Sequence, residues 1–274
     1  MTGRSGLRLL LADVDGTLVT DDKQLTPAAV AAVQDLRRAG IAFAITSSRP
    51  PNGLRMLVAP LDLQLPLAGL NGGLLVDPDM SVIACYPIGP VAAAQSVNLL
   101  LSHQLDVWIY TADAWLVRDP TAAHVTREAW ILGFPPEIVT SFTAEHLAQA
   151  VKIVGVSDDL DLVAACEAQA QTSLGASASA TRSNAYFLDV TNPKANKGAV
   201  VVELSVRLGI APDQIATIGD MPNDVLMFRQ SGLSIAMGNA SDEVKAQANH
   251  VTDSNQDEGF AKAVRNFVLP IAAP

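Results

Sequence analysis

The residue types best suited to chemistry stand together near the start of the chain, in Asp13-Val14-Asp15-Gly16-Thr17. Residues two apart on an extended backbone point to the same side, so both carboxylates can face one substrate. A carboxylate can attack phosphorus if it is placed in line and a divalent cation neutralises the phosphoryl oxygens, and Asp13 fits that position. Asp15 could then protonate the leaving oxygen and later deprotonate water. The alternative interpretation is an ordinary Asp/Gly turn at the end of a strand.

A second polar segment, Thr46-Ser47-Ser48-Arg49, also follows an apolar run. A hydroxyl and the backbone N–H after it can hold a phosphate oxygen through neutral donors, so Ser47 and Ser48 are candidate substrate-binding residues. Arg49, and Asn71 in a glycine-rich turn, are further candidates for substrate contact. Ser and Thr after a strand are also common in turns that bind nothing.

A lysine, Lys197, opens a predicted helix and is followed by Gly198. A positive charge at a helix start is unfavourable for the helix dipole, which suggests that Lys197 is aimed at an anion gathered there. Lysines are usually solvated, and Lys194 is a competing candidate three residues earlier. The glycine after Lys197 favours the later residue.

The segment Gly219-Asp220-Met221-Pro222-Asn223-Asp224 lies between an apolar strand and a helix. In open α/β sheets ligands bind outside the carboxyl ends of the strands, so this segment is expected to face the first one. Asp13, Asp220 and Asp224 would then offer hard oxygen ligands, which suit Mg²⁺. Asn223 or Asp224 could instead cap the helix, and both roles can coexist.

The segments belong to a chain in which strands alternate with helices, a pattern typical of a parallel sheet covered on both faces. Thr26 and Pro27 predict the start of the first helix, and Gly40 predicts its end. Strands are predicted at residues 7–12, 41–46, 65–70, 215–218 and 233–236, with later helices at 197–208 and 223–230.

Residues 83–187, in the middle of the chain, have a different sequence pattern, in which aromatic or β-branched runs stand between helical stretches. We interpret it as an inserted α/β cap, and residues 1–82 with 188–274 as the catalytic core. The expected fold class is therefore α/β, a Rossmann-like doubly wound parallel sheet with an inserted cap.

Several cap side chains could face a substrate, although aromatics in strand patterns are more often core and arginines more often solvated. They are Trp108, Tyr110, Trp115, Arg118, His124, Arg127 and Arg182.

The composition describes a globular protein: 274 residues, 49% of them hydrophobic and 17% charged, can bury a sizeable core. The formal net charge of -10 and the absence of any Lys/Arg cluster argue against nucleic acid as a partner. A small anionic substrate stays possible, because one metal ion and a few cations can reverse the field inside a cleft.

The cysteine pattern favours a reducing compartment, since Cys85 and Cys166 are far apart and lack metal-ligand spacing. No apolar run is long enough to span a membrane, and Asp13 interrupts the run that could have been a signal segment. The histidines show no zinc-binding spacing. We expect a cytoplasmic protein without a membrane partner, whose oligomeric state the sequence leaves open.

In order and separation, the four segments resemble the motifs of the haloacid dehalogenase (HAD) superfamily, specifically the Cof-type sugar-phosphatase branch with a large α/β cap. The resemblance spans nearly the whole chain. It implies that Asp13 is the nucleophile and that Asp15 is the acid/base and offers its backbone carbonyl to Mg²⁺. It also implies that Asp220 is the remaining protein ligand of the metal.

By the same resemblance, Ser47 and Lys197 bind the phosphoryl group, and Asn223 and Asp224 support the metal and the phosphate from one loop. The branch commonly has Thr-Gly-Arg where this chain has Ser47-Ser48-Arg49. The hydroxyl is kept and the glycine is lost, so the backbone path there can differ.

The activity implied is Mg²⁺-dependent hydrolysis of small phosphorylated metabolites, sugar phosphates foremost, through an aspartyl phosphate. A phosphohexomutase would carry the same motifs, because exclusion of water by the cap decides where the phosphoryl group goes. A catalytically silent sugar-phosphate sensor would lose a motif residue, yet none of the acids is missing. A receiver-type signalling domain is about half this length and has no inserted cap.

Overall fold

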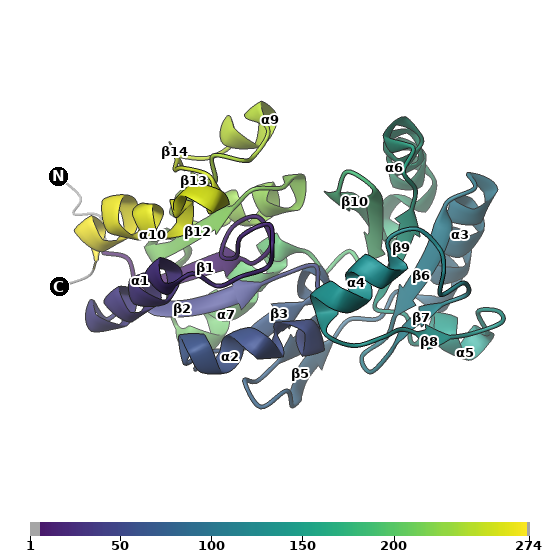
Figure 1. Ribbon diagram of the computed structural model, residues 1–274, viewed down its shortest axis with the longest axis horizontal. Helices are drawn as coiled ribbons and strands as arrows, with labels where there is room; N and C mark the ends of the chain where they lie inside the picture. The colour runs from purple at the N-terminus through teal and green to yellow at the C-terminus, as the bar shows by residue number, and fades with distance from the viewer. Residues whose placement is uncertain (1–5, 273–274) are drawn as a thin grey trace.

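The computed structural model describes residues 6–272, which form two α/β units, each built on its own sheet. Figure 1 shows the core unit on the left and the cap unit on the right. The core sheet has the strand order β14-β13-β12-β1-β2-β3-β4-β5, and the cap sheet the order β10-β11-β9-β6-β7-β8.

The core strands are β1 Leu9–Asp13, β2 Ala42–Thr46, β3 Leu67–Gly69, β4 Leu74–Val76, β5 Val82–Cys85, β12 Ile215–Gly219, β13 Leu233–Ala236 and β14 His250–Val251. Its helices are α1 Pro27–Arg38, α2 Arg55–Leu61, α7 Lys197–Leu208, α8 Val225–Phe228, α9 Asp242–Lys245 and α10 Gly259–Ala263. The strands from β14 through β3 pair in parallel, and β4 and β5 extend the sheet as antiparallel strands.

The cap strands are β6 Asp106–Tyr110, β7 Trp115–Val117, β8 Glu137–Ile138, β9 Lys152–Val156, β10 Ser179–Asn184 and β11 Phe187–Thr191. Its helices are α3 Pro90–Ser102, α4 Val125–Leu132, α5 Ala144–Ala148 and α6 Leu160–Leu174. The central strand β9 pairs antiparallel with both β6 and β11.

Residues 9–12 of β1 are all apolar because both faces of the strand are covered. Leu10 and Ala12 join the cluster that α1 covers, whereas Leu9 and Leu11 join the cluster that α7 covers. Alternate residues of a strand point to opposite faces, so a run without polar residues indicates a central strand of a doubly wound sheet. The expected α/β fold class with its parallel core and inserted cap is confirmed.

The first helix begins where the sequence predicts. The Thr26 hydroxyl accepts a hydrogen bond from the backbone N–H of Ala29 at 3.1 Å, and Pro27 occupies the first turn. The predicted strands at 7–12, 41–46, 65–70 and 215–218 each correspond to a core strand with shifted ends, and the predicted strand at 233–236 has the bounds of β13.

The chain passes between the two sheets at residues 86–89 and 192–196. The Asn192 side chain joins these connections by donating to the carbonyl of Pro87 at 2.8 Å. The division into a core of residues 1–82 and 188–274 and a cap of 83–187 stays a prediction. Sheet membership alone places Val82–Cys85 with the core and Phe187–Thr191 with the cap.

Three aromatic residues from the cap strands pack inside the cap. Trp108 and Trp115 meet edge to face at 5.3 Å between ring centroids, and Tyr110 stacks on Trp115 at 5.8 Å. All three are buried. Among the helices within residues 6–272, none has the length and apolarity needed to cross a bilayer.

Leu10→Ala tests the packing of the central strand. The Leu10 side chain is fully buried, so its truncation should lower the free energy of unfolding by about 2–5 kcal/mol, through lost burial and the cavity left behind. Urea denaturation measures this loss. Val206→Ala, at a side chain that is 79% exposed on α7, is the control and should change stability by less than about 0.5 kcal/mol.

Candidate active site

The predicted acidic and hydroxyl residues lie at one edge of the core sheet. Asp13 ends β1 and pairs in register with Thr46, which ends β2. On the other side of β1, strand β12 ends at Gly219, directly before Asp220. Because these neighbouring strands are parallel, their carboxyl ends gather the following residues into one place.

Lys197 stands at the centre of this edge and is only 2% exposed. Its ammonium donates to Asp13 Oδ1 and to Asp224 Oδ1, each at 2.6 Å. Burial alone would lower the pKa of Lys197, but the two carboxylates outweigh it and raise that pKa above its usual value. Lys194, the competing candidate, is exposed and contacts none of these acids.

The three acids of this site crowd together. Carboxylate oxygens of Asp13, Asp220 and Asp224 all lie within 4.8 Å of one another, and the Thr17 hydroxyl donates to Asp220 Oδ1 at 3.1 Å. The backbone of Gly16 passes so close that a Cβ there would lie 2.3 Å from Asp220 Oδ2, and its φ of +75° also favours glycine.

The charges of this cluster are not balanced by Lys197 alone. Burial raises the pKa of Asp13 to about 7, although Lys197 lowers it, and the Asp224 carboxylate adds to the rise. Burial also raises the pKa of Asp220, and the charges of Asp13 and Asp224 act in the same direction. A set of buried carboxylate oxygens with excess negative charge fits a hard divalent cation.

Asp224 has both of its oxygens engaged by the protein. Oδ1 accepts from Lys197, and Oδ2 accepts from the backbone N–H groups of Asp220 and Met221, each at 2.9 Å. The carboxylate therefore holds the loop after β12 in shape and orients Lys197. These contacts favour an indirect role for Asp224 at a metal ion.

Asp15 is held by two cations. Arg49 binds it through two hydrogen bonds of 2.6 Å, and the Lys23 ammonium lies 2.7 Å from Oδ1. Burial on its own would raise the pKa of Asp15, but Arg49 and Lys23 together lower it to about 2. Arg49 also donates to the carbonyl of Ile131 in α4 at 3.2 Å, so one side chain joins the core to the cap.

Ser47 and Ser48 lie in the loop after β2, beside Asp13. The buried Ser47 hydroxyl accepts from the backbone N–H of Arg49 at 3.1 Å, which turns the loop. The carbonyl of Ser48 accepts from the ammonium of Lys152, a cap residue, at 2.9 Å.

The two predicted amides, Asn71 and Asn223, are bound to each other. Asn223 Nδ2 donates to Asn71 Oδ1 at 3.0 Å, and Asn71 Nδ2 donates to Asp189 Oδ2 at 2.8 Å. Lys152 also pairs with Asp189 at 3.3 Å, and both residues are buried. The amides therefore couple the loop after β12 to the cap.

Sequence reasoning missed Lys152 and Asp189, through which the cap contacts Ser48 and Asn71 of the core. A signal was present, because each is a lone charge inside an otherwise apolar strand run, in 151–156 and 187–191. A charge at such a position is costly to bury unless it is paired.

A cavity of about 390 Å³ opens over the acids, between the core and the cap. Asp15, Arg49 and Asp220 line it from the core, and Arg127 and Glu128 line it from α4. Of the cap candidates, Arg127 alone among the described residues borders this cavity. His124 lies behind the wall and stacks on Tyr186.

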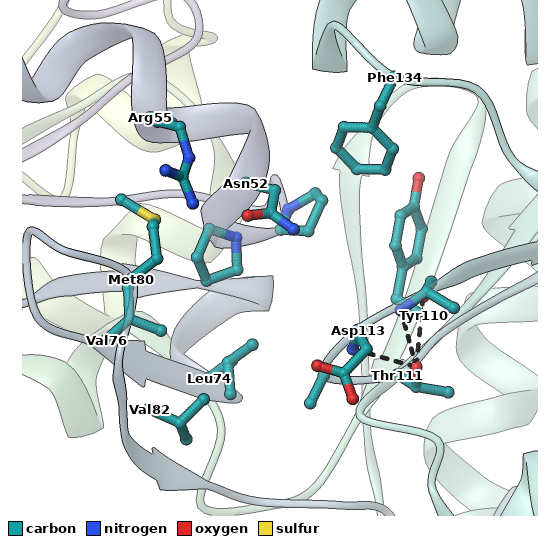
Figure 2. Close-up of a pocket in the computed structure, with 14 residues that line it drawn as sticks. Asn52, Arg55, Leu74, Val76, Met80, Val82, Tyr110, Thr111, Asp113 and Phe134 are labelled. Carbon is teal, nitrogen blue, oxygen red and sulfur yellow. Dashed lines mark hydrogen bonds between the residues drawn. The ribbon is translucent and has the colours of Figure 1, made fainter.

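The other cap candidates face elsewhere. Arg182 pairs with Glu167 at 2.8 Å, and Arg118 lies 4.0 Å from Asp106. Figure 2 shows a second cavity, of about 200 Å³, where Tyr110 and Phe134 of the cap face Asn52 and Arg55 of the core. It contains none of the predicted acids, so we place the candidate site in the larger cavity.

The sequence of the chain matches the model of the haloacid dehalogenase-like hydrolase family over residues 10–264, so the protein belongs to this family. Pyridoxal phosphate phosphatase YbhA of Escherichia coli is 26% identical, with 96% of this chain and 99% of that protein covered. The 5-amino-6-(5-phospho-D-ribitylamino)uracil phosphatase YcsE of Bacillus subtilis is 26% identical, with 96% of each covered.

Solved structures share the fold. A haloacid dehalogenase-like hydrolase from B. subtilis superposes with a TM-score of 0.84 at 22% identity, covering 95% of this chain and 100% of that one. The HAD subclass IIB sugar phosphatase BT4131 gives 0.82 at 20% identity, covering 96% and 99%. The expected Cof-type branch and the expected enzyme class, a phosphoric monoester hydrolase, are confirmed.

Paired substitutions test the buried ion pair between cap and core. Lys152→Met or Asp189→Leu alone leaves a buried charge without its partner and should cost about 3–5 kcal/mol of unfolding free energy. The double variant should cost clearly less than the sum of the two, as measured by urea denaturation. Equal and additive losses would contradict the pairing. Arg182→Ala, which breaks a more exposed pair, should cost about 1 kcal/mol or less.

Arg49→Met tests the state of Asp15. The folded pKa of about 2 lies below the value of about 3.9 for an unfolded Asp. The pairing therefore stabilises the fold above about pH 4, and the contribution is lost as the pH falls toward 2. The variant should lose more unfolding free energy at neutral pH than at acidic pH, in urea titrations. A loss independent of pH would contradict the assignment; Arg38→Met on the exposed face of α1 is the control.

Proposed function

We propose that the protein is a Mg²⁺-dependent phosphatase that hydrolyses small phosphorylated metabolites through an aspartyl phosphate on Asp13. The observation that carries the proposal is the buried arrangement of Asp13, Lys197 and Asp220 at the carboxyl edge of the sheet. A nucleophile, a cation for the phosphoryl oxygens and acidic metal ligands meet there in one place.

The metal site is assigned to the carboxylates of Asp13 and Asp220 and the backbone carbonyl of Asp15. Mg²⁺ in this position supplies positive charge to the phosphoryl oxygens. Asp224 supports the metal site without binding the ion itself, because its oxygens already accept hydrogen bonds from Lys197 and two backbone N–H groups. The hydrogen bond between Asn223 and Asn71 likewise holds the loop after β12 beside the turn after β3.

The chemistry uses the two acids in turn. An Asp13 oxygen attacks phosphorus, the bond from phosphorus to the leaving oxygen breaks, and Asp15 gives that oxygen a proton. Water then attacks the aspartyl phosphate, and Asp15 takes the proton of the water while Asp13 leaves. Because Arg49 and Lys23 keep Asp15 ionised, they must release it and it must take up a proton from solvent before it first acts as an acid.

The phosphoryl group is assigned to Ser47, Ser48 and Lys197. The Ser47 hydroxyl and the backbone N–H of Ser48 offer neutral donors, and Lys197 offers a charge. Arg49 is placed to move from Asp15 to the substrate, since its guanidinium lines the cavity. These contacts hold the phosphorus in line with Asp13.

The substrates are proposed to be small phosphorylated metabolites, with sugar phosphates foremost. The named relatives act on phosphate esters with dissimilar leaving groups, so we transfer only their shared chemistry. We also propose that the protein acts in the cytoplasm. Its two free cysteines, Cys85 and Cys166, are consistent with a reducing compartment.

Hydrolysis of an aryl phosphate tests the proposal. Turnover should require Mg²⁺ and stop with EDTA, and Asp13→Asn should lower it by several orders of magnitude, because the attacking oxygen is lost. A phosphate-release assay measures both effects. Asp22→Asn, at an exposed carboxylate nearby, is the control and should keep full activity. Undiminished turnover by Asp13→Asn would refute the proposed nucleophile.

A further inference from the structure

Two carboxylates that line the cavity have no part in the proposed mechanism: that of Asp21, which accepts a hydrogen bond from Asn255 at 3.0 Å, and that of Glu128 in α4. Its Oε1 accepts a hydrogen bond from the Tyr110 hydroxyl, at a long 3.3 Å. Within residues 6–272, no Lys, Arg or His lies within ion-pair distance of it, and no other donor reaches its side chain. The carboxylate thus faces the cavity with an oxygen available to a ligand.

One set of contacts places Glu128 beside the phosphate-binding loop. Its hydrogen-bond partner Tyr110 has the Lys152 ammonium over its ring, 4.9 Å from the centroid. The same ammonium donates to the carbonyl of Ser48 at 2.9 Å. Glu128 is therefore linked through Tyr110 and Lys152 to the loop assigned to the phosphoryl group.

A second set of contacts places Glu128 beside the acid/base. Ile131 follows it by three residues on α4, so the two residues share one face of the helix. The carbonyl of Ile131 accepts from Arg49, and Arg49 binds Asp15 at 2.6 Å. Glu128 thus lies close to where Asp15 would meet the leaving oxygen of a substrate.

The rest of the cavity wall favours a hydroxylated leaving group over a flat aromatic one. Ser183 and Asn184 line it with polar side chains, and its aromatic rings, Tyr186 and Phe187, pack edge to face against each other. Tyr186 has one face covered by His124, whose ring lies parallel to it with centroids 4.1 Å apart. A ligand that supplies donors suits this wall better than one that needs apolar contact.

We propose that Glu128 determines specificity by accepting a hydrogen bond from a hydroxyl on the carbon next to the ester carbon. The preferred substrates are then phosphate monoesters that carry a hydroxyl on that neighbouring carbon. This inference rests on the proposed phosphatase function. The carboxylate is partly removed from water, which raises its pKa, and a substrate hydroxyl restores the hydrogen bond that burial takes away.

A pair of substrates that differ by one hydroxyl tests the inference, namely 2-hydroxypropyl phosphate and n-propyl phosphate. The wild-type enzyme should have a kcat/KM about tenfold to a hundredfold higher for the hydroxylated ester, the effect of one hydrogen bond to a charged group. Glu128→Gln should reduce that ratio and Glu128→Ala should bring it close to one. Glu145→Gln, an exposed cap glutamate, should leave it unchanged.

The outcomes separate the inference from the proposed function. Equal kcat/KM values for the two esters, or a preference that both Glu128 variants retain, would overturn the role of Glu128 while leaving the phosphatase intact. Absence of turnover with these esters and with an aryl phosphate would overturn the function and the inference together. Unfolding midpoints of the variants, measured alongside, show whether a reduced ratio comes from folded protein.

Discussion

The buried ammonium of Lys197, held between Asp13 and Asp224, is the interaction on which the candidate site depends. Without it, three carboxylates would meet at one edge of the sheet with no cation from the protein. Its position requires α7 to begin at this edge, where Asn196 caps the first turn. It also requires Gly198, because a Cβ there would lie 2.7 Å from the carbonyl of Leu226 in the neighbouring helix.

Paired charges in a closed space also join the cap to the core. Arg49 connects Asp15 to the backbone of α4, and Lys152 connects Asp189 to the loop of Ser48. The loops after β1 and β2 are thereby each linked to a cap element by a charged side chain. Movement of the cap relative to the core would change these contacts.

The sequence could predict the core half of this arrangement. Asp13, Asp15, Lys197 and Asp220 lie in segments that follow or precede regular elements, and the parallel sheet brings such positions together without further information. Lys152, Asp189 and Glu128 could not be assigned in this way, because they belong to the cap and meet the core only through tertiary packing. The short strands β4, β5 and β14 were also absent from the prediction, since few residues leave little periodicity to detect.

Trapping the phosphoenzyme shows directly whether Asp13 becomes phosphorylated during turnover. Wild-type protein mixed with Mg²⁺ and an excess of aryl phosphate should be quenched in acid during turnover, digested and analysed by mass spectrometry. We expect one added phosphoryl group on the peptide that contains Asp13. Treatment with hydroxylamine should remove this group. Steady turnover with no phosphorylated peptide, or a phosphoryl group on another residue, would contradict the assignment of Asp13 as the nucleophile.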